Sequence, residues 1–198
     1  FLALAFASFQ FGGVGFLTWM PTYLYENFHF SLARAGFDST FYHFVAAFFG
    51  VMAGARISDI FSSRIVGFRG MVQMTGLFIM VPVVFFMTKS DSILIVYLTL
   101  TVFGFCRGIY DSNIFAALYD VIEMPYRSTA TGVMLMFAFV VGSLAPYLLG
   151  LLKPVFGLSN GLASLSLSYL LAGIFILIAL LFSYKKDSIK EELLQADA

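Results

Sequence analysis

The chain has 198 residues, of which 61% are hydrophobic and 11% are charged, and its formal net charge at pH 7 is zero. Soluble domains carry about 25% charged residues, so this composition excludes an ordinary soluble domain and indicates a membrane protein. Neither sign of charge forms a patch, which excludes a nucleic-acid-binding surface.

Long apolar stretches follow one another along nearly the whole chain. They cover residues 1–22, 34–61, 69–88, 92–119, 129–151 and 162–184. Each reaches the ~20 residues that a helix needs to cross the hydrocarbon core, and the strict alternation of a spanning strand is absent. The sequence therefore predicts an all-α membrane protein with six transmembrane helices.

Basic residues near the helix ends predict the orientation. Seven lie on the side of the termini, against three on the other side: Arg56, Arg64, Arg69, Arg127, Lys185, Lys186 and Lys190 against Arg34, Lys89 and Lys153. By the positive-inside rule both termini are cytoplasmic, and we expect a bacterial inner (plasma) membrane. Residues 185–198 mix both signs and predict a cytoplasmic tail. The chain starts at Phe1, inside an apolar stretch and without signal-peptide features, so we interpret it as cut from a longer chain or lacking its beginning.

The first stretch carries one amide near its middle, Gln10, in a segment that also holds Gly12, Gly13 and Gly15. The amide either bonds to a neighbouring helix or contacts a substrate. The glycines indicate close helix packing or a bend.

The second stretch has a polar cluster near its outer third. Asp38 and Tyr42 lie one helical turn apart, as do Ser39 and His43, so these side chains face neighbouring helices rather than lipid. Asp38 either lines an outer vestibule or is a first-turn acid that the helix dipole favours. Imidazole exchanges protons near neutral pH, which makes His43 a candidate for proton coupling, but an intramembrane His more often bonds to another helix.

The fourth stretch holds the strongest candidates for function. Arg107 falls about halfway along it and Asp111 follows one turn later, so the two side chains can pair. They either lock helix packing, form a gating contact, or line a wet cavity in which Arg107 binds a carboxylate or phosphate. We favour the cavity, because intramembrane ionisable groups are costly. Tyr110 and Tyr42 accompany these polar groups and are candidates for ligand contact.

Pairs of glycines four residues apart indicate close helix crossings. They are Gly50 with Gly54 in the second stretch, and Gly104 with Gly108 in the fourth. Small residues at this spacing let helix backbones approach each other.

The loop after the second stretch resembles the loop signature of the major facilitator superfamily. In that signature a small residue precedes an Asp by four positions and basic residues follow; here Ala55, Asp59 and Arg64 match. The immediate basic residue and the internal Gly are missing, as is usual for the weaker copy in that family's second half.

Two other segments carry the same resemblance. Residues 125–132, with Pro125 and Arg127, and residues 142–146 are similar to the loop and fifth helix of the carboxyl-terminal half of such transporters. Residues 19–24 and 30–36 resemble the seventh-helix region of the family's organic anion and sugar-acid symporters. From the residues themselves, we expect Ser128 or Thr129 to cap the fifth helix.

This resemblance implies helices seven to twelve of a twelve-helix transporter, arranged as two inverted three-helix repeats. The first, second, fourth and fifth helices would border the central cavity. Asp59, Arg64 and Arg127 would belong to gating loops, and Arg107, Asp111, Gln10, Tyr110 and Tyr42 would contact substrate, with Asp111, Asp38 and His43 as proton-coupling candidates.

The sequence thus predicts a proton-coupled secondary transporter of a small organic anion, such as a sugar acid, by alternating access. Neutral sugars are the alternative substrates, and an intramembrane enzyme is a remote alternative because no protease motif is present. We expect no cofactor or metal. The partners are the lipid bilayer, a small-molecule substrate and an amino-terminal half, from the same chain or a second copy.

Overall fold

A computed structural model describes residues 1–183 of the chain. The elements in order are α1 (Leu2–Phe28), α2 (Leu32–Phe61), α3 (Phe68–Met87), α4 (Ile93–Tyr119), the 3-10 helix η1 (Met124–Tyr126), α5 (Arg127–Phe156), α6 (Leu158–Ser164), α7 (Ser166–Ile178) and the π-helical η2 (Ala179–Ser183). The predicted tail at 185–198 lies outside the described residues.

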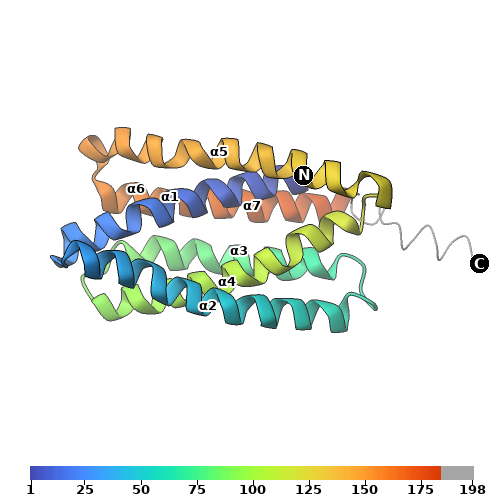
Figure 1. Ribbon diagram of the computed structural model, residues 1–198, viewed down its shortest axis with the longest axis horizontal. Coiled ribbons are helices and arrows are strands. Elements are labelled where there is room, and N and C mark those ends of the chain that lie inside the picture. Colours follow the sequence, from blue (N-terminus) through green and yellow to red (C-terminus); the bar gives the residue numbers. More distant parts are fainter. Residues whose placement is uncertain (184–198) are drawn as a thin grey trace, which may run out of the picture.

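The described part holds six helical segments long and apolar enough to cross a membrane, the last of them formed by α6, α7 and the start of η2. They lie side by side along the long axis of the molecule (Figure 1). The α1–α2, α3–α4 and α5–α6 connections lie at one end, and the α2–α3 and α4–α5 connections at the other. The predicted all-α membrane fold is confirmed.

Helix contacts follow the pattern of two inverted three-helix repeats. α2 packs chiefly on α4, and its counterpart α5 packs chiefly on α1. The third helix of each repeat behaves alike, since α3 contacts α4, α7 contacts α1, and α3 and α7 contact each other. The first helix of each repeat therefore packs against the second and third helices of the other repeat. This is the arrangement predicted for half of a facilitator fold.

The predicted close crossing of α2 and α4 is confirmed. A Cβ atom built on Gly50 would lie 2.1 Å from the Phe105 carbonyl oxygen, and one on Gly108 would lie 2.1 Å from the Ala47 carbonyl oxygen. The other members of the pairs, Gly54 and Gly104, face the partner helix backbone in the same way. Larger side chains at these positions would force the two helices apart.

The six spans are buried to different degrees, and this positions the candidate site. Half of the most apolar window of α1 and 44% of that of α4 are buried, but only 22% in α2 and in α5. Phe48 of α2 and Met136 of α5 are among the exposed hydrophobic side chains of these two helices. α1, α4 and the α6–α7 span, which is also 44% buried, therefore lie deeper in the bundle than α2 and α5.

The predicted cap of the fifth helix is wrong. α5 begins at Arg127 with Tyr126 in the N-cap position, and no side chain bonds to its first backbone N–H groups. The reason is that η1 runs directly into α5, so Ser128 and Thr129 already lie inside the helix.

Candidate functional site

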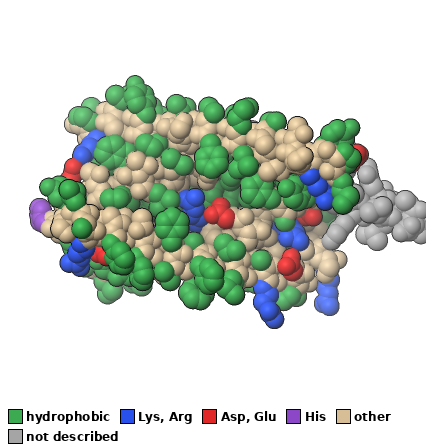
Figure 2. Space-filling model, viewed as in Figure 1, with side chains coloured by type: hydrophobic (Ala, Val, Ile, Leu, Met, Phe, Trp, Pro, Cys, Tyr) green, Lys and Arg blue, Asp and Glu red, His purple; other side chains and the backbone are tan. Residues whose placement is uncertain are grey.

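An ion pair lies at mid-length of α4. Arg107 Nε is 3.4 Å from Asp111 Oδ2, and the two side chains are 18% and 41% exposed. The predicted pairing at i, i+4 is confirmed. On the face drawn in Figure 2, charged side chains gather at the two ends of the molecule, and one basic and one acidic side chain lie together at mid-length among hydrophobic ones.

The guanidinium of Arg107 occupies a slot that a glycine of α1 leaves open. A Cβ atom on Gly13 would lie 2.8 Å from Arg107 Nη1, and the ring of Phe9 lies 5.5 Å from Arg107 Cζ. Nη1 is buried and has no hydrogen-bond partner. A buried charged donor without a partner costs more than the ~1–3 kcal/mol of a neutral one, so this atom would gain free energy from a hydrogen-bond acceptor.

Gln10 lies on the same helix as Gly13 and is 4% exposed. A Cβ atom on Gly142 of α5 would lie 3.3 Å from the Gln10 carbonyl oxygen, which puts Gln10 at the α1–α5 contact. Its side-chain Oε1 is buried without a partner. This oxygen therefore makes no bond to another helix, and it does not bond to Arg107 Nη1.

Tyr110 lies behind the ion pair, in the core. Its side chain is fully buried, its ring stacks on Phe9 with centroids 4.0 Å apart, and its hydroxyl has no partner. In this conformation Tyr110 supports Phe9, which in turn borders Arg107.

Tyr169 of α7 was not among the predicted site residues, yet it shares this environment. It is fully buried, its hydroxyl has no partner, and its ring meets Phe9 edge-on at 6.2 Å. A Cβ atom on Gly12 would lie 2.7 Å from Tyr169 Cζ. The adjacent glycines 12 and 13 thus make room for Tyr169 of α7 and Arg107 of α4. This pair of glycines was the feature of the sequence that could have indicated a large side chain from a second helix here.

A second polar cluster lies near the α1–α2 end of the bundle. Asp38 Oδ2 accepts a hydrogen bond from the Tyr97 hydroxyl at 2.6 Å and lies 3.3 Å from Arg34 Nε. Tyr42 stacks on Tyr97 with centroids 4.3 Å apart. Tyr97 precedes Arg107 by ten residues, about 15 Å along the helix axis. Asp38 and Tyr42 are therefore not brought together with Arg107.

The interpretation of Asp38 as a first-turn acid is wrong. α2 begins at Leu32, so the first turn holds no acid and Asp38 lies in the second turn. Its 7% exposure follows from its bond to α4 rather than from the helix dipole.

His43 makes no bond to another helix, contrary to the more common behaviour of an intramembrane His. The side chain is fully buried, and neither ring nitrogen has a hydrogen-bond partner. The ring lies against Phe103 of α4, with centroids 5.3 Å apart, and against Phe44. These aromatic neighbours offer no strong hydrogen-bond acceptor, which explains the missing bond.

The predicted loop residues lie at the opposite end. Asp59 Oδ1 is 3.4 Å from Arg69 Nη2, and Arg69 Nε is 3.7 Å from Asp120 Oδ2. Arg69 therefore ties together the ends of α2, α3 and α4, a role that sequence reasoning did not assign to it. Arg64 is exposed.

Arg127 holds the end of α4. Its Nη2 donates to the Tyr119 carbonyl oxygen at 2.9 Å, and its Nε donates to the Ile122 carbonyl oxygen at 3.1 Å. Helix C-termini leave carbonyl groups unsatisfied, and Arg127 satisfies two at the α4–α5 turn.

Within residues 1–183 no cluster of three or more His, Cys, Asp or Glu side chains could hold a metal ion.

Comparisons with known proteins agree with this architecture. A family model described as Major Facilitator Superfamily matches residues 1–146. The fold is similar to the crystal structure of a bacterial homologue of the human lysosomal transporter Spinster, in an inward-facing and occupied conformation, with a TM-score of 0.78 and 16% sequence identity. The match covers 96% of this chain and 49% of that one, so the chain spans about half the length of the Spinster homologue. No curated protein sequence matches the chain.

Proposed function

We propose that this chain, which belongs to the Major Facilitator Superfamily and is therefore an integral membrane protein, forms half of a proton-coupled secondary transporter that imports small organic anions. We assign it to the carboxyl-terminal half, with both termini in the cytoplasm of a bacterial cell. A sugar acid is the substrate class that its resemblance to the family's anion symporters favours.

The observation that carries the proposal is the unpartnered Nη1 atom of Arg107. A guanidinium binds a carboxylate through two parallel N–H bonds, and here only Nε is engaged, with Asp111 at 3.4 Å. An entering carboxylate competes with Asp111 for the exposed part of the fork, and the buried Nη1 gains a partner when the guanidinium turns from Gly13 toward the ligand. Substrate charge is thereby matched at mid-membrane, where an unpaired charge is expensive.

Proton coupling follows from that competition. When the substrate displaces Asp111 from Arg107, the freed carboxylate takes up a proton, so the site stays electrically neutral. Asp111 is 41% exposed and can exchange this proton with a hydrated cavity. Asp38 is already held by Tyr97 and Arg34, and His43 is fully buried, so we favour Asp111 among the three candidates.

Alternating access requires a second wall for the cavity. The chain spans 49% of the Spinster homologue, and we propose that an amino-terminal half, from the same chain or from a second copy, faces α1 and α4. The Asp59–Arg69–Asp120 contacts and Arg127 would stabilise one end while the halves rock against each other.

Uptake into proteoliposomes tests the proposal. The intact protein is supplied with labelled sugar acids, sugar phosphates, dicarboxylates and neutral sugars, with and without an inward proton gradient. We expect accumulation of one anionic class only when the gradient is present. Accumulation of neutral sugars alone would contradict the anion assignment.

Arg107 variants refine this test. Arg107→Ala should reduce uptake to the level of protein-free liposomes, and Arg107→Lys should bind more weakly because it keeps the charge but loses the fork. Both variants should elute as the wild type does in size-exclusion chromatography. Wild-type uptake by folded Arg107→Ala would remove Arg107 from the mechanism.

A further inference from the structure

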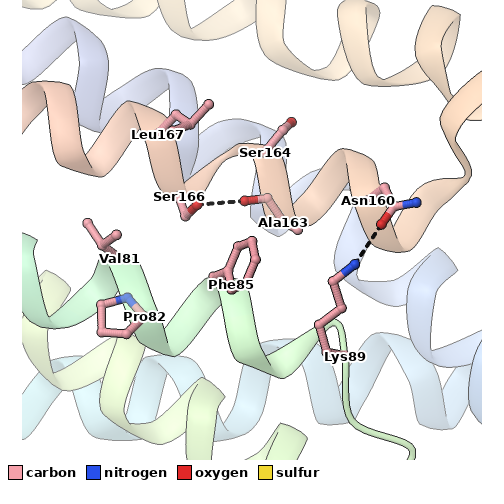
Figure 3. A pocket seen from close by; sticks show the side chains of 9 residues that line it. All are labelled: Val81, Pro82, Phe85, Lys89, Asn160, Ala163, Ser164, Ser166 and Leu167. Atoms are coloured by element: carbon pink, nitrogen blue, oxygen red, sulfur yellow. Dashed lines mark hydrogen bonds between the residues drawn. The ribbon is translucent and has the colours of Figure 1, made fainter.

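A pocket of about 520 Å³ lies between α3 and the α6–α7 segment, and none of its lining residues belongs to the candidate site. Val81, Pro82 and Phe85 of α3 form one wall, and Leu167 of α7 belongs to the other. Lys89 and Asn160 meet at one end of the pocket (Figure 3). The volume falls within the ~300–1,000 Å³ typical of small-ligand pockets.

The pocket borders a local break in the α-helical hydrogen bonding of the sixth membrane span, at Leu165, whose backbone stays in the right-handed helical region (φ −64°, ψ −19°). α6 ends at Ser164 and α7 begins at Ser166, on either side of Leu165. The two serine hydroxyls donate back to the carbonyl oxygens of Gly161 and Ala163, at 2.6 and 2.7 Å. Such back-bonding is associated with bent helices, and both serines line the pocket. The break thus helps to shape one wall.

Lys89 is held at the pocket mouth. It follows the end of α3 and donates from Nζ to Asn160 Oδ1 at 2.8 Å, while Asn160 Nδ2 donates to the Phe156 carbonyl oxygen at 2.9 Å. The amide is therefore oriented from both sides. An ammonium group has three N–H donors, so Lys89 can bind an anion without releasing Asn160.

Lys89 differs from the other basic side chains at this end of the bundle. At this end of the bundle Arg34 pairs with Asp38, and Lys153 pairs with Glu26. No ion pair within residues 1–183 includes Lys89. A cation at the end of a membrane span, beside a mostly apolar pocket, is the complement of a lipid phosphate with its acyl chain.

We propose that this pocket binds an anionic phospholipid, with one acyl chain between Phe85 and Leu167 and the phosphate at Lys89. Burial of the chain is favoured by the apolar walls, and the phosphate gains a charge-assisted hydrogen bond. A zwitterionic lipid fits less well because its own ammonium group competes with Lys89. The site does not depend on what Arg107 binds.

Native mass spectrometry of the intact, detergent-purified protein tests the site. The protein is titrated with dioleoyl phosphatidylglycerol or with dioleoyl phosphatidylcholine, which share the same chains. We expect phosphatidylglycerol to bind more tightly. Lys89→Gln should weaken its first binding step by about fivefold to tenfold and weaken phosphatidylcholine binding by less. Lys153→Gln removes the same charge at the same end and should not weaken phosphatidylglycerol binding.

A second variant tests the apolar part of the pocket. Ser164→Trp places a large ring in the pocket, keeps Lys89, and should weaken binding of both lipids; it remains informative if Lys89→Gln fails to fold. The proposal is overturned if the two lipids bind equally, if the two lysine variants lose affinity together, or if Ser164→Trp has no effect. Displacement of the lipid by an equal concentration of glycerol phosphate would also overturn it, since the chain would then contribute nothing.

Discussion

Two ionic clusters are embedded in the same bundle, and they differ in how completely their polar atoms are paired. At the Asp38 cluster the carboxylate accepts from Tyr97 at 2.6 Å and contacts Arg34 at 3.3 Å. At the Arg107 cluster the only ion-pair contact is 3.4 Å long, and Nη1 is buried without a partner.

Under the proposed function, this difference distinguishes a structural contact at Asp38 from a binding site at Arg107. Burying a charge is tolerated when hydrogen bonds compensate for lost hydration, and Asp38 meets this condition by itself. Arg107 does not meet it, because its Nη1 atom is buried without a hydrogen-bond acceptor, in the space that the missing side chain of Gly13 leaves. A cluster that is incomplete alone gains free energy when a ligand completes it, whereas a complete cluster has nothing to gain.

Replacing the aspartate of each cluster by asparagine should give the largest difference in proton-driven accumulation between the two clusters. Asp111→Asn keeps the shape of the side chain but removes its proton-binding group, so accumulation driven by a pH gradient should fall to the background of protein-free liposomes. Exchange of labelled for unlabelled substrate needs no net proton movement and should persist. Asp38→Asn should leave accumulation near the wild-type level. Both activities are measured in proteoliposomes of intact protein.

Loss of accumulation in Asp38→Asn, with accumulation retained in Asp111→Asn, would reverse the roles assigned to the clusters. Loss of exchange as well as accumulation in folded Asp111→Asn would make Asp111 a substrate-binding group rather than a coupling group.

The pairing of Arg107 with Asp111 was predictable because it depends only on the spacing along one helix. The bond between Asp38 and Tyr97 joins residues 59 positions apart, and no local pattern identifies that partner. The separation of Tyr42 from Arg107 was visible in the sequence, because the Tyr42 cluster lies near the outer third of its stretch and Arg107 lies about halfway along its own. The two were grouped as substrate contacts on polarity alone.

Gly13→Ala should have the next largest effect. A Cβ atom there would lie 2.8 Å from Arg107 Nη1, and because that atom is the end of a flexible side chain, the guanidinium should shift while the fold is retained. We expect the KM for the anion to rise by about tenfold, as for a weakened charged hydrogen bond. The measurement is uptake against substrate concentration.

Gly132→Ala is the matched control, because nothing lies within 4 Å of its Cβ position. It should leave KM unchanged. An unchanged KM in Gly13→Ala would mean that the slot beside Arg107 does not set ligand geometry.

The fold itself was more accessible to sequence reasoning than the site. Helix number and the close α2–α4 crossing follow from apolar length and glycine spacing. The break at Leu165 is not marked by a glycine or proline at that position; it coincides with two serine hydroxyls bonded back to α6 carbonyls. Tyr169 was likewise missed because its importance depends on the space that Gly12 leaves across the bundle.

Tyr97→Phe should have the smallest effect and should act on stability alone. The change removes the hydroxyl that donates to Asp38 but keeps the ring that stacks on Tyr42 at 4.3 Å. The lost bond should lower the free energy of unfolding by about 1 kcal/mol, seen as a lower thermal midpoint in detergent. Tyr147→Phe, at a side chain 65% exposed, should not change it.

Transport by Tyr97→Phe shows whether the Asp38 cluster has a structural role only or also takes part in proton transfer. If the cluster only holds α2 against α4, uptake at a temperature well below the midpoint should match that of the wild type, because Asp38 keeps its contact with Arg34. Uptake that falls while the thermal midpoint stays constant would place Asp38 on the proton path. The two clusters would then act together rather than as a structural contact and a binding site.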